Sequence, residues 1–205
     1  MKLTWLGHAC FVLEHEGYRI VADPYLRVED YPHMHTQAHA YTCSHQHLDH
    51  NGPERVELLE QRESPFTVET VSTFHDPEGG SLRGANTIHI YSAGGIRVAH
   101  MGDLGHRLTA EQVEAIGPLD AVMIPVGGFY TIDAEEAKAV CEALKPRVVI
   151  PMHYRHDGHG LAVVAGVEPF LELWDKEEVH REESNTIAIT PEKSGVWVPT
   201  YHIPE

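Results

Sequence analysis

"SHQHLDHNG", from Ser44 to Gly52, places three histidines and one aspartate within six consecutive positions. Alternate residues of an extended segment point the same way, so His45 and His47 can reach one metal ion. Asp49 and His50 lie beyond the bend and can reach a second ion. Imidazole together with carboxylate suits zinc, and also iron or manganese. The chain holds 17 histidines in 205 residues, so only clustered donors indicate a site.

Further donors stand where apolar strands are expected to end. His75 follows "TVSTF", Asp103 follows "VAHMG" and His153 follows "VVIPM". Residues just beyond neighbouring strand ends can face one shared crevice, so donors far apart in the sequence can converge. A carboxylate such as that of Asp103 can bridge two cations. These positions therefore predict the remaining ligands of a metal centre.

Strand patterns dominate the first half of the chain. Residues 2–26 predict an antiparallel meander, residues 66–73 a strand, and "TIHIYS" with "IRVAHM" a hairpin. A helix is expected after Pro53, because proline suits the first helical turn and a partial apolar face follows it.

Helices alternate with buried strands in the second half. Capping boxes at Thr109-x-x-Gln112 and Asp133-x-x-Glu136 start two helices, and "DAVMIPV" and "RVVIPM" are buried strands. A further helix is expected in "EPFLELWDKEE", and "NTIAIT" and "GVWVPTY" close the chain as strands. This order predicts a sandwich of sheets covered by helices.

Length and charge limit the classes of protein. The 205 residues predict one domain spanning 1–205. A net charge of −16, with 15 basic against 31 acidic residues and no Lys/Arg cluster, argues against nucleic acid as a main partner.

Three features predict a cytoplasmic protein without a membrane partner. The amino terminus is expected to form a strand pair instead of a signal peptide, because His8 and Gly7 interrupt its apolar run. No stretch approaches the roughly 18 apolar residues of a spanning helix. Cys10, Cys43 and Cys141 are odd in number and widely separated, as expected of reduced core thiols. A homo-oligomer stays possible.

"SHQHLDHNG", "HMGD" and "PMHY", with "ADP" upstream, resemble the ordered motifs of the metallo-β-lactamase-fold hydrolases. The resemblance covers about residues 3–154. "WLGHACFVLE", "VADPY" and "PVGGFYTID" look most like the small subgroup that includes the ascorbate-phosphate lactonases. The resemblance implies an α+β four-layer αββα sandwich with a two-metal site on its edge.

The same resemblance implies two divalent metal ions, with zinc favoured and manganese or iron as alternatives, and assigns their ligands by position. The first ion would take His45, His47 and His75, the second Asp49, His50 and His153, with Asp103 between them and Asp23 orienting the ligands.

One segment departs from the family pattern. In "FHDPEGG", Asp76 directly follows His75, where the family usually has a small or hydroxyl residue before a glycine. His89 is therefore the alternative third ligand.

Several other residues are candidates for contact with the substrate. Asp49 could hold the attacking hydroxide, and His8 could contact the substrate or donate a proton. Tyr154 and His106 flank predicted ligands and could donate to an oxyanion. The rim of the pocket could be lined by His33, His35 and His39.

The chemistry that follows is metal-assisted hydrolysis of a small-molecule ester, lactone or phosphodiester. No Gly-x-Ser-x-Gly elbow is present in the sequence, so a serine nucleophile is not expected. One alternative is a nuclease-type phosphodiesterase, which the acidic charge disfavours. Another is a mononuclear iron protein or a non-hydrolytic metal or redox protein of the same fold.

Overall fold

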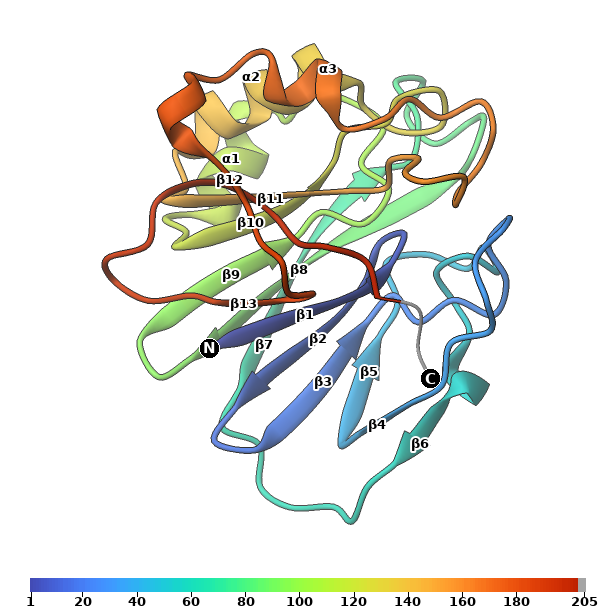
Figure 1. The fold of residues 1–205 in the computed structure, drawn as a ribbon, viewed down its shortest axis with the longest axis vertical. Coiled ribbons are helices and arrows are strands. Elements are labelled where there is room, and N and C mark those ends of the chain that lie inside the picture. The colour runs from blue at the N-terminus through green and yellow to red at the C-terminus, as the bar shows by residue number, and fades with distance from the viewer. Residues whose placement is uncertain (203–205) are drawn as a thin grey trace.

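Two facing β-sheets form the centre of the computed structural model, which describes residues 1–202 (Figure 1). The first sheet has five strands and contains the amino-terminal meander. Neighbouring strands run antiparallel except for the last pair, which is parallel. In spatial order they are β13 (Thr186–Ala188), β1 (Lys2–Gly7), β2 (Cys10–His15), β3 (Tyr18–Ala22) and β5 (Ala40–Thr42).

The second sheet has seven strands and combines an antiparallel half with a parallel half. The β7, β8 and β9 strands pair antiparallel, whereas the pairs from β9 to β12 are parallel. The predicted hairpin is thus confirmed as β8 and β9. In spatial order the strands are β12 (Val179–Arg181), β14 (Gly195–Val198), β11 (Val148–Met152), β10 (Ala121–Pro125), β9 (Ile96–His100), β8 (Ala85–Ala93) and β7 (Thr67–Phe74).

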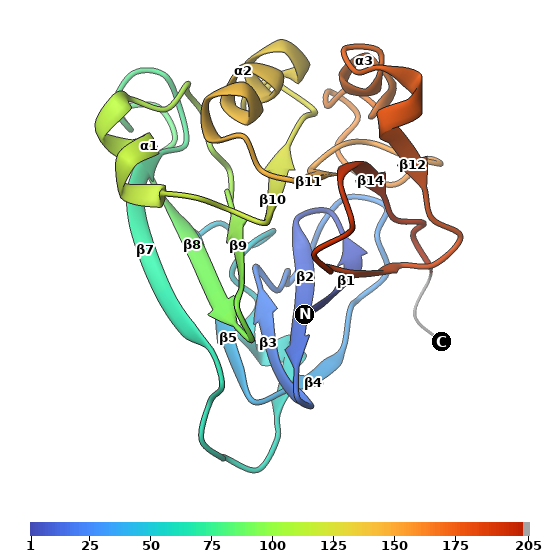
Figure 2. The same cartoon turned by 90° about the vertical axis from the view of Figure 1, so that its left-hand side faces the viewer.

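Three α-helices cover the outer face of the seven-stranded sheet (Figure 2). They are α1 (Ala110–Ile116), α2 (Ala134–Leu144) and α3 (Glu168–Leu171). Both predicted capping boxes are present, because the side chains of Thr109 and Asp133 each accept a hydrogen bond from the backbone N–H three residues later. Buried residues recur at helical spacing along α2 and dock it on the sheet: Ala137, Val140, Cys141 and Leu144. No helix in residues 1–202 has the length and apolar content needed to cross a membrane.

A short parallel ribbon and irregular chain cover the outer face of the five-stranded sheet. The ribbon pairs β4 (Thr36–Ala38) with β6 (Val56–Leu58). A second hydrophobic cluster lies beneath it and joins side chains of β2 and β3 to those of the covering segment: Cys10, Val12, Val21, Tyr25, Val28, Tyr31, Met34, Ala38 and Val56. The α+β sandwich is confirmed, and in the described chain this outer layer holds no α-helix.

Two predicted helices are wrong in extent. After Pro53 the chain forms only a single 3-10 turn (Pro53–Arg55), because buried Val56 then turns extended and pairs with β4. The segment "EPFLELWDKEE" forms the four-residue α3 and a separate 3-10 turn (Lys176–Glu178). Asp175 has extended backbone angles (φ −62°, ψ 139°), and they interrupt the helix.

Candidate metal centre

The metal-binding motif lies in the loop that follows β5. Backbone N–H groups of His50 and Asn51 both donate to the His47 carbonyl oxygen, at 3.0 and 2.9 Å, and this turn directs the donors inward. Gly52 then packs against the segment that follows β3. A Cβ at this position would lie 2.3 Å from the backbone nitrogen of Leu26, so only glycine fits.

The loop and the end of β7 form the first donor set. His45, His47 and His75 offer three ring nitrogens that lie within 4.8 Å of one another. His75 immediately follows β7, so the predicted convergence of strand ends is observed here. By contrast, His89 lies within β8 beside Tyr91, at a ring-centroid distance of 6.2 Å, and belongs to neither donor set.

The second donor set lies next to the first. Ligand atoms of His8, Asp49, His50 and His153 lie within 4.8 Å of one another. His8 follows β1 and His153 follows β11, and their rings are 4.2 Å apart between centroids. The structure therefore places His8 beside the ligands that the resemblance implies for the second ion.

Asp103 lies between the two donor sets. Its Oδ2 atom is 3.1 Å from His75 Nε2 and 3.8 Å from His45 Nε2, both in the first set. From the second set, His50 Nε2 is 3.1 Å from Asp103 Oδ1, and His153 Nε2 is 3.4 Å from Asp103 Oδ2. A carboxylate that faces both sets has the position that a bridging ligand requires.

Asp23 orients the second set from behind. Its carboxylate accepts hydrogen bonds from Ser44 N (2.7 Å), Ser44 Oγ (2.5 Å) and His50 Nδ1 (2.7 Å). Burial raises the pKa of Asp23, but the neighbouring His100 and His50 and the Ser44 hydroxyl outweigh it and lower the pKa to about 2. The carboxylate thus holds the proton of His50 on Nδ1 and directs Nε2 toward Asp103, an arrangement typical of metal-binding histidines.

Backbone strain is concentrated at the same place. His8, Asp23 and His153 have φ values of 52°, 50° and 52°, in the left-handed region that non-glycine residues rarely adopt. Each residue lies just beyond a strand, and the His153 N–H donates to the His8 carbonyl oxygen at 3.2 Å. Strained backbone of this kind clusters at functional sites, where it fixes the direction of side chains.

The donor atoms fit metal ions. Burial lowers the pKa of His8 to about 4 and that of His45 to about 3, so both imidazoles are neutral at pH 7 and able to bind a cation. Within residues 1–202, four buried Nε2 atoms have no hydrogen-bond partner, and they belong to His8, His45, His50 and His153. Buried polar atoms without partners are costly, and bound cations would satisfy them.

A cavity of about 330 Å³ opens onto the donors. Its other walls are formed by residues that the sequence analysis did not single out: Leu82, Arg83, Tyr130 and Leu161. "PVGGFYTID" had indicated the segment around Tyr130 through the family resemblance, but neither spacing nor composition marked Arg83.

Asp76 has a structural role that explains the departure in "FHDPEGG". Its buried carboxylate accepts hydrogen bonds from four backbone N–H groups of the loop that follows His75. Burial raises the pKa of Asp76, but these bonds, that of Arg83 foremost, outweigh it and lower the pKa below its ordinary value. The aspartate therefore shapes the loop and leaves His75 in the first donor set.

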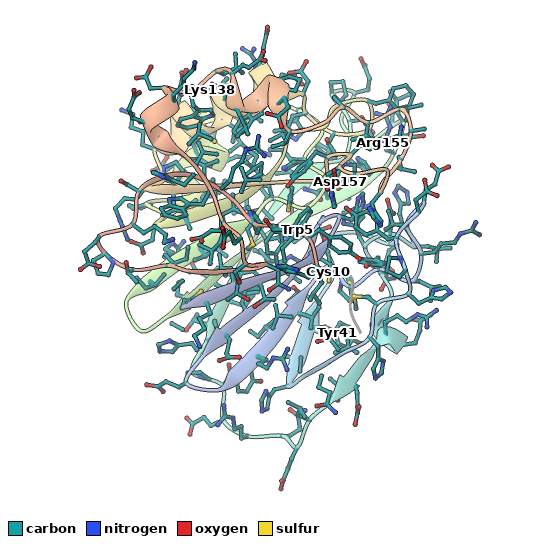
Figure 3. All side chains as sticks on the ribbon, in the orientation of Figure 1. Trp5, Cys10, Tyr41, Lys138, Arg155 and Asp157 are labelled. Atoms are coloured by element: carbon teal, nitrogen blue, oxygen red, sulfur yellow. The ribbon has the colours of Figure 1, made fainter. Side chains whose placement is uncertain are left out.

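Two expected oxyanion donors lie elsewhere in the structure. The Tyr154 ring packs against Trp5, with centroids 5.5 Å apart, and borders a separate cavity with Arg155 and Asp157. Trp5, Arg155 and Asp157 are labelled in Figure 3. His106 accepts a hydrogen bond from the backbone N–H of Phe74 at 3.2 Å and does not line the metal cavity.

The three histidines expected at the rim also do not border the cavity. His39 stacks on the ring of Tyr18, with centroids 4.5 Å apart. His33 and His35 lie next to the covering ribbon, where His35 Nε2 is 3.8 Å from a carboxylate oxygen of Glu57. These three residues precede the motif in the sequence but do not border the metal cavity in the structure.

Similarity to known proteins agrees with this geometry. Residues 2–153 match the family model described as the beta-lactamase superfamily domain. A metal-dependent hydrolase of the UPF0173 group from Hyperthermus butylicus is 31% identical over 196 residues, covering 74% of this chain and 82% of that protein. A related UPF0173 protein from Pyrococcus furiosus is 30% identical over 179 residues, covering 75% and 83%.

A solved structure is similar over nearly the whole chain. It is a protein from Thermotoga maritima assigned to the Zn-dependent hydrolases of the metallo-β-lactamase superfamily, with a TM-score of 0.79 and 36% identity. The match covers 98% of this chain and 99% of that one. The chain belongs to the metallo-β-lactamase superfamily. Within it, the protein is an enzyme of the metal-dependent hydrolase class.

Proposed function

We propose that the protein hydrolyses a small-molecule ester, lactone or phosphodiester with two divalent metal ions, of which zinc is the favoured one. The observation that carries this proposal is Asp103, whose two carboxylate oxygens face donor nitrogens of both sets. A single site would not need a carboxylate between two separate groups of histidines. When bound, two such ions supply hydroxide at neutral pH and polarise the oxygen of the scissile bond.

Each donor set has a defined task in this proposal. His45, His47 and His75 hold the first ion, and Asp49, His50 and His153 hold the second. Asp23 keeps His50 in the orientation that the site requires, through the bond to Nδ1.

His8 and Asp49 form the pair that can move a proton. His8 Nε2 lies 3.4 Å from Asp49 Oδ2, and Asp49 borders the cavity in which the substrate would bind. A proton taken up at Asp49 Oδ2 during attack can pass to His8 Nε2, whose neutral imidazole is free to accept it.

The size of the cavity supports a small substrate. About 330 Å³ accommodates a compact organic molecule and lies at the lower end of the usual range for ligand sites. The charge of −16 would repel a polynucleotide, so a monomeric phosphodiester is favoured over nucleic acid.

The test is hydrolysis by the zinc-loaded protein of chromogenic esters, phosphodiesters and a lactone panel, repeated after removal of metal with a chelator. We expect turnover of at least one class, its loss on chelation and its return with zinc. Asp49→Ala should abolish turnover while the protein stays folded by circular dichroism. Full activity in this variant, or in the metal-free protein, would contradict the proposal. Oxygen-dependent turnover by an iron-loaded form without hydrolysis would favour the redox alternative.

A further inference from the structure

Arg83 lies at the metal cavity with most of its hydrogen-bonding capacity unused. Its Nη2 donates to the carbonyl oxygen of Phe129 at 3.2 Å, and its Cζ lies 5.5 Å from the centre of the Tyr130 ring. No carboxylate of residues 1–202 lies within ion-pair distance of it. A guanidinium carries five N–H donors in a planar fork, so several remain available to a ligand.

The loop that carries Arg83 is rigidly built around Asp76. One carboxylate oxygen accepts from the N–H groups of Glu78 and Gly80, both at 2.9 Å. The other accepts from Leu82 at 3.1 Å and from Arg83 itself at 2.7 Å. The Asp76 side chain is buried, and its four bonds fix the backbone from which Arg83 extends.

The second support of Arg83 is a strained turn. Phe129 is 62% exposed, yet its φ is 63°, which is unusual for a bulky side chain. This conformation directs its carbonyl oxygen to Arg83, and Tyr130, the next residue, borders the cavity. Backbone bonds from Tyr130 N to Gly128 O (2.8 Å) and from Gly128 N to Ile132 O (3.3 Å) hold this turn, so the acceptor for Arg83 has a fixed position.

The charge of the cavity makes the arginine distinctive. Among the described residues that line it, Arg83 is the one lysine or arginine, beside Asp49 and Asp103. Those two carboxylates face the metal donors, so their charge would be neutralised by bound cations. The guanidinium would remain as a separate positive group on the wall of the cavity.

We propose that Arg83 is an anion-binding subsite beside the metal centre, so that the substrate carries a carboxylate or phosphate separate from the bond that is cleaved. Guanidinium binds such oxyanions through two parallel N–H bonds. Asp76 is a positioning residue, because it acts through the backbone of Arg83 and does not line the cavity itself. The inference rests on the proposed function for the reaction, but the subsite can be tested by binding alone.

The test compares dicarboxylates with their monomethyl esters by isothermal titration of the zinc-loaded protein. A series from malonate to adipate varies the spacing between the two carboxylates stepwise. Carboxyphosphonates of the same length distinguish a phosphate-selective subsite from a carboxylate-selective one.

Arg83→Gln is the test variant and Arg62→Gln is its matched control. Arg62 makes the same two contacts, a bond from Nη2 to a backbone carbonyl oxygen (Glu16, 3.0 Å) and a position 5.6 Å above a tyrosine ring (Tyr18). It lies away from the metal cavity, beside a separate surface pocket.

We expect at least one dianion to bind the parent and Arg62→Gln about 10- to 100-fold more tightly than its monomethyl ester. In Arg83→Gln this preference should fall below about threefold. Arg83→Lys keeps the charge but not the planar fork, so it should retain part of the preference and serves if the glutamine variant does not fold. No preference in the parent, or the full preference in Arg83→Gln, would overturn the subsite.

Hydrolysis separates this inference from the proposed function. An Arg83-dependent preference in a protein that hydrolyses nothing leaves the subsite intact and refutes the hydrolase. Metal-dependent hydrolysis without any such preference would support the hydrolase and refute the subsite.

Asp76→Asn tests the positioning role. It should remove most of the dianion preference, leave the affinity for the monomethyl ester within about threefold, and add little to the effect of Arg83→Gln in the double variant. A merely structural role would weaken both ligands equally, and a retained preference would contradict positioning.

Discussion

Replacement of Asp23 by asparagine should weaken metal binding although Asp23 itself is no predicted ligand. The carboxylate accepts three buried hydrogen bonds, from Ser44 N, Ser44 Oγ and His50 Nδ1. An amide keeps one acceptor oxygen and turns an NH₂ group toward donors, so His50 loses the bond that fixes its orientation. Loss of such a partner typically lowers metal affinity about 10- to 100-fold, or about 1.4 to 2.7 kcal/mol.

The same change should lower the stability of the metal-free protein. Hydrogen bonds to a buried charge are worth about 1.5 to 3 kcal/mol each, and part of this is retained by the amide, so we expect a loss of about 2 to 4 kcal/mol. Guanidinium denaturation measures this loss, and competition with a chromophoric zinc chelator measures affinity at each site.

Asp120→Asn is the control for these two effects. Asp120 also accepts two hydrogen bonds, from Arg97 N at 2.8 Å and Arg147 Nη2 at 2.7 Å, but it precedes β10, at the opposite strand end from the centre. It should lower stability and leave zinc affinity unchanged. Parental zinc affinity in Asp23→Asn, or equal weakening in both variants, would refute the reasoning.

Three further results are expected. Thr109→Ala removes the side chain that caps α1 and should lower the free energy of unfolding by about 1 kcal/mol in guanidinium denaturation; an unchanged midpoint would contradict this. Burial raises the pKa of Cys10, Cys43 and Cys141, the last two to about 12, so fewer thiolates form at pH 8. In the absence of reductant, a thiol reagent should therefore react at least about 100-fold more slowly with the native protein than with the unfolded chain. Titration of the unfolded chain should find three reactive thiols. Rapid reaction of the native protein, or fewer than three thiols, would contradict this prediction. Gly105→Ala places a Cβ 2.2 Å from the backbone carbon of His75, directly after β7. This variant should lose zinc content and melt at a lower temperature, and full zinc content would contradict the prediction.

Local patterns predicted the parts of the fold that depend on neighbours in sequence. The capping boxes at Thr109 and Asp133 are visible as residue types at fixed spacing, and both form in the structure. The helix expected after Pro53 failed because the pairing of Val56 with β4 is a contact across 20 residues. Burial of an apolar residue is compatible with helix or strand, and only the tertiary partner decides.

The donor sets were accessible to sequence analysis for a different reason. Donors that follow apolar strands meet at one edge of a sandwich, and this brought His75, Asp103 and His153 to the motif. Arg83 could not be found in this way. It reaches the cavity through the bonds of Asp76 and the strained turn at Phe129, which are properties of folded loops.

Tyr154 shows the limit of adjacency in sequence. It directly follows His153, but the left-handed backbone of His153 (φ 52°) lies just beyond the end of β11 and turns the chain at this point. Its ring therefore packs on Trp5, away from the centre. Adjacency to a donor residue in the sequence therefore does not fix the direction of the next side chain.

The most direct test of the two-metal centre is the number and place of ions bound per chain. Elemental mass spectrometry on protein purified without added metal gives the number, and anomalous diffraction at the metal edge gives the positions. We predict two ions, one among His45, His47 and His75 and one among Asp49, His50 and His153, with Asp103 between them. A single ion, or two ions bound away from Asp103, would contradict a dinuclear centre.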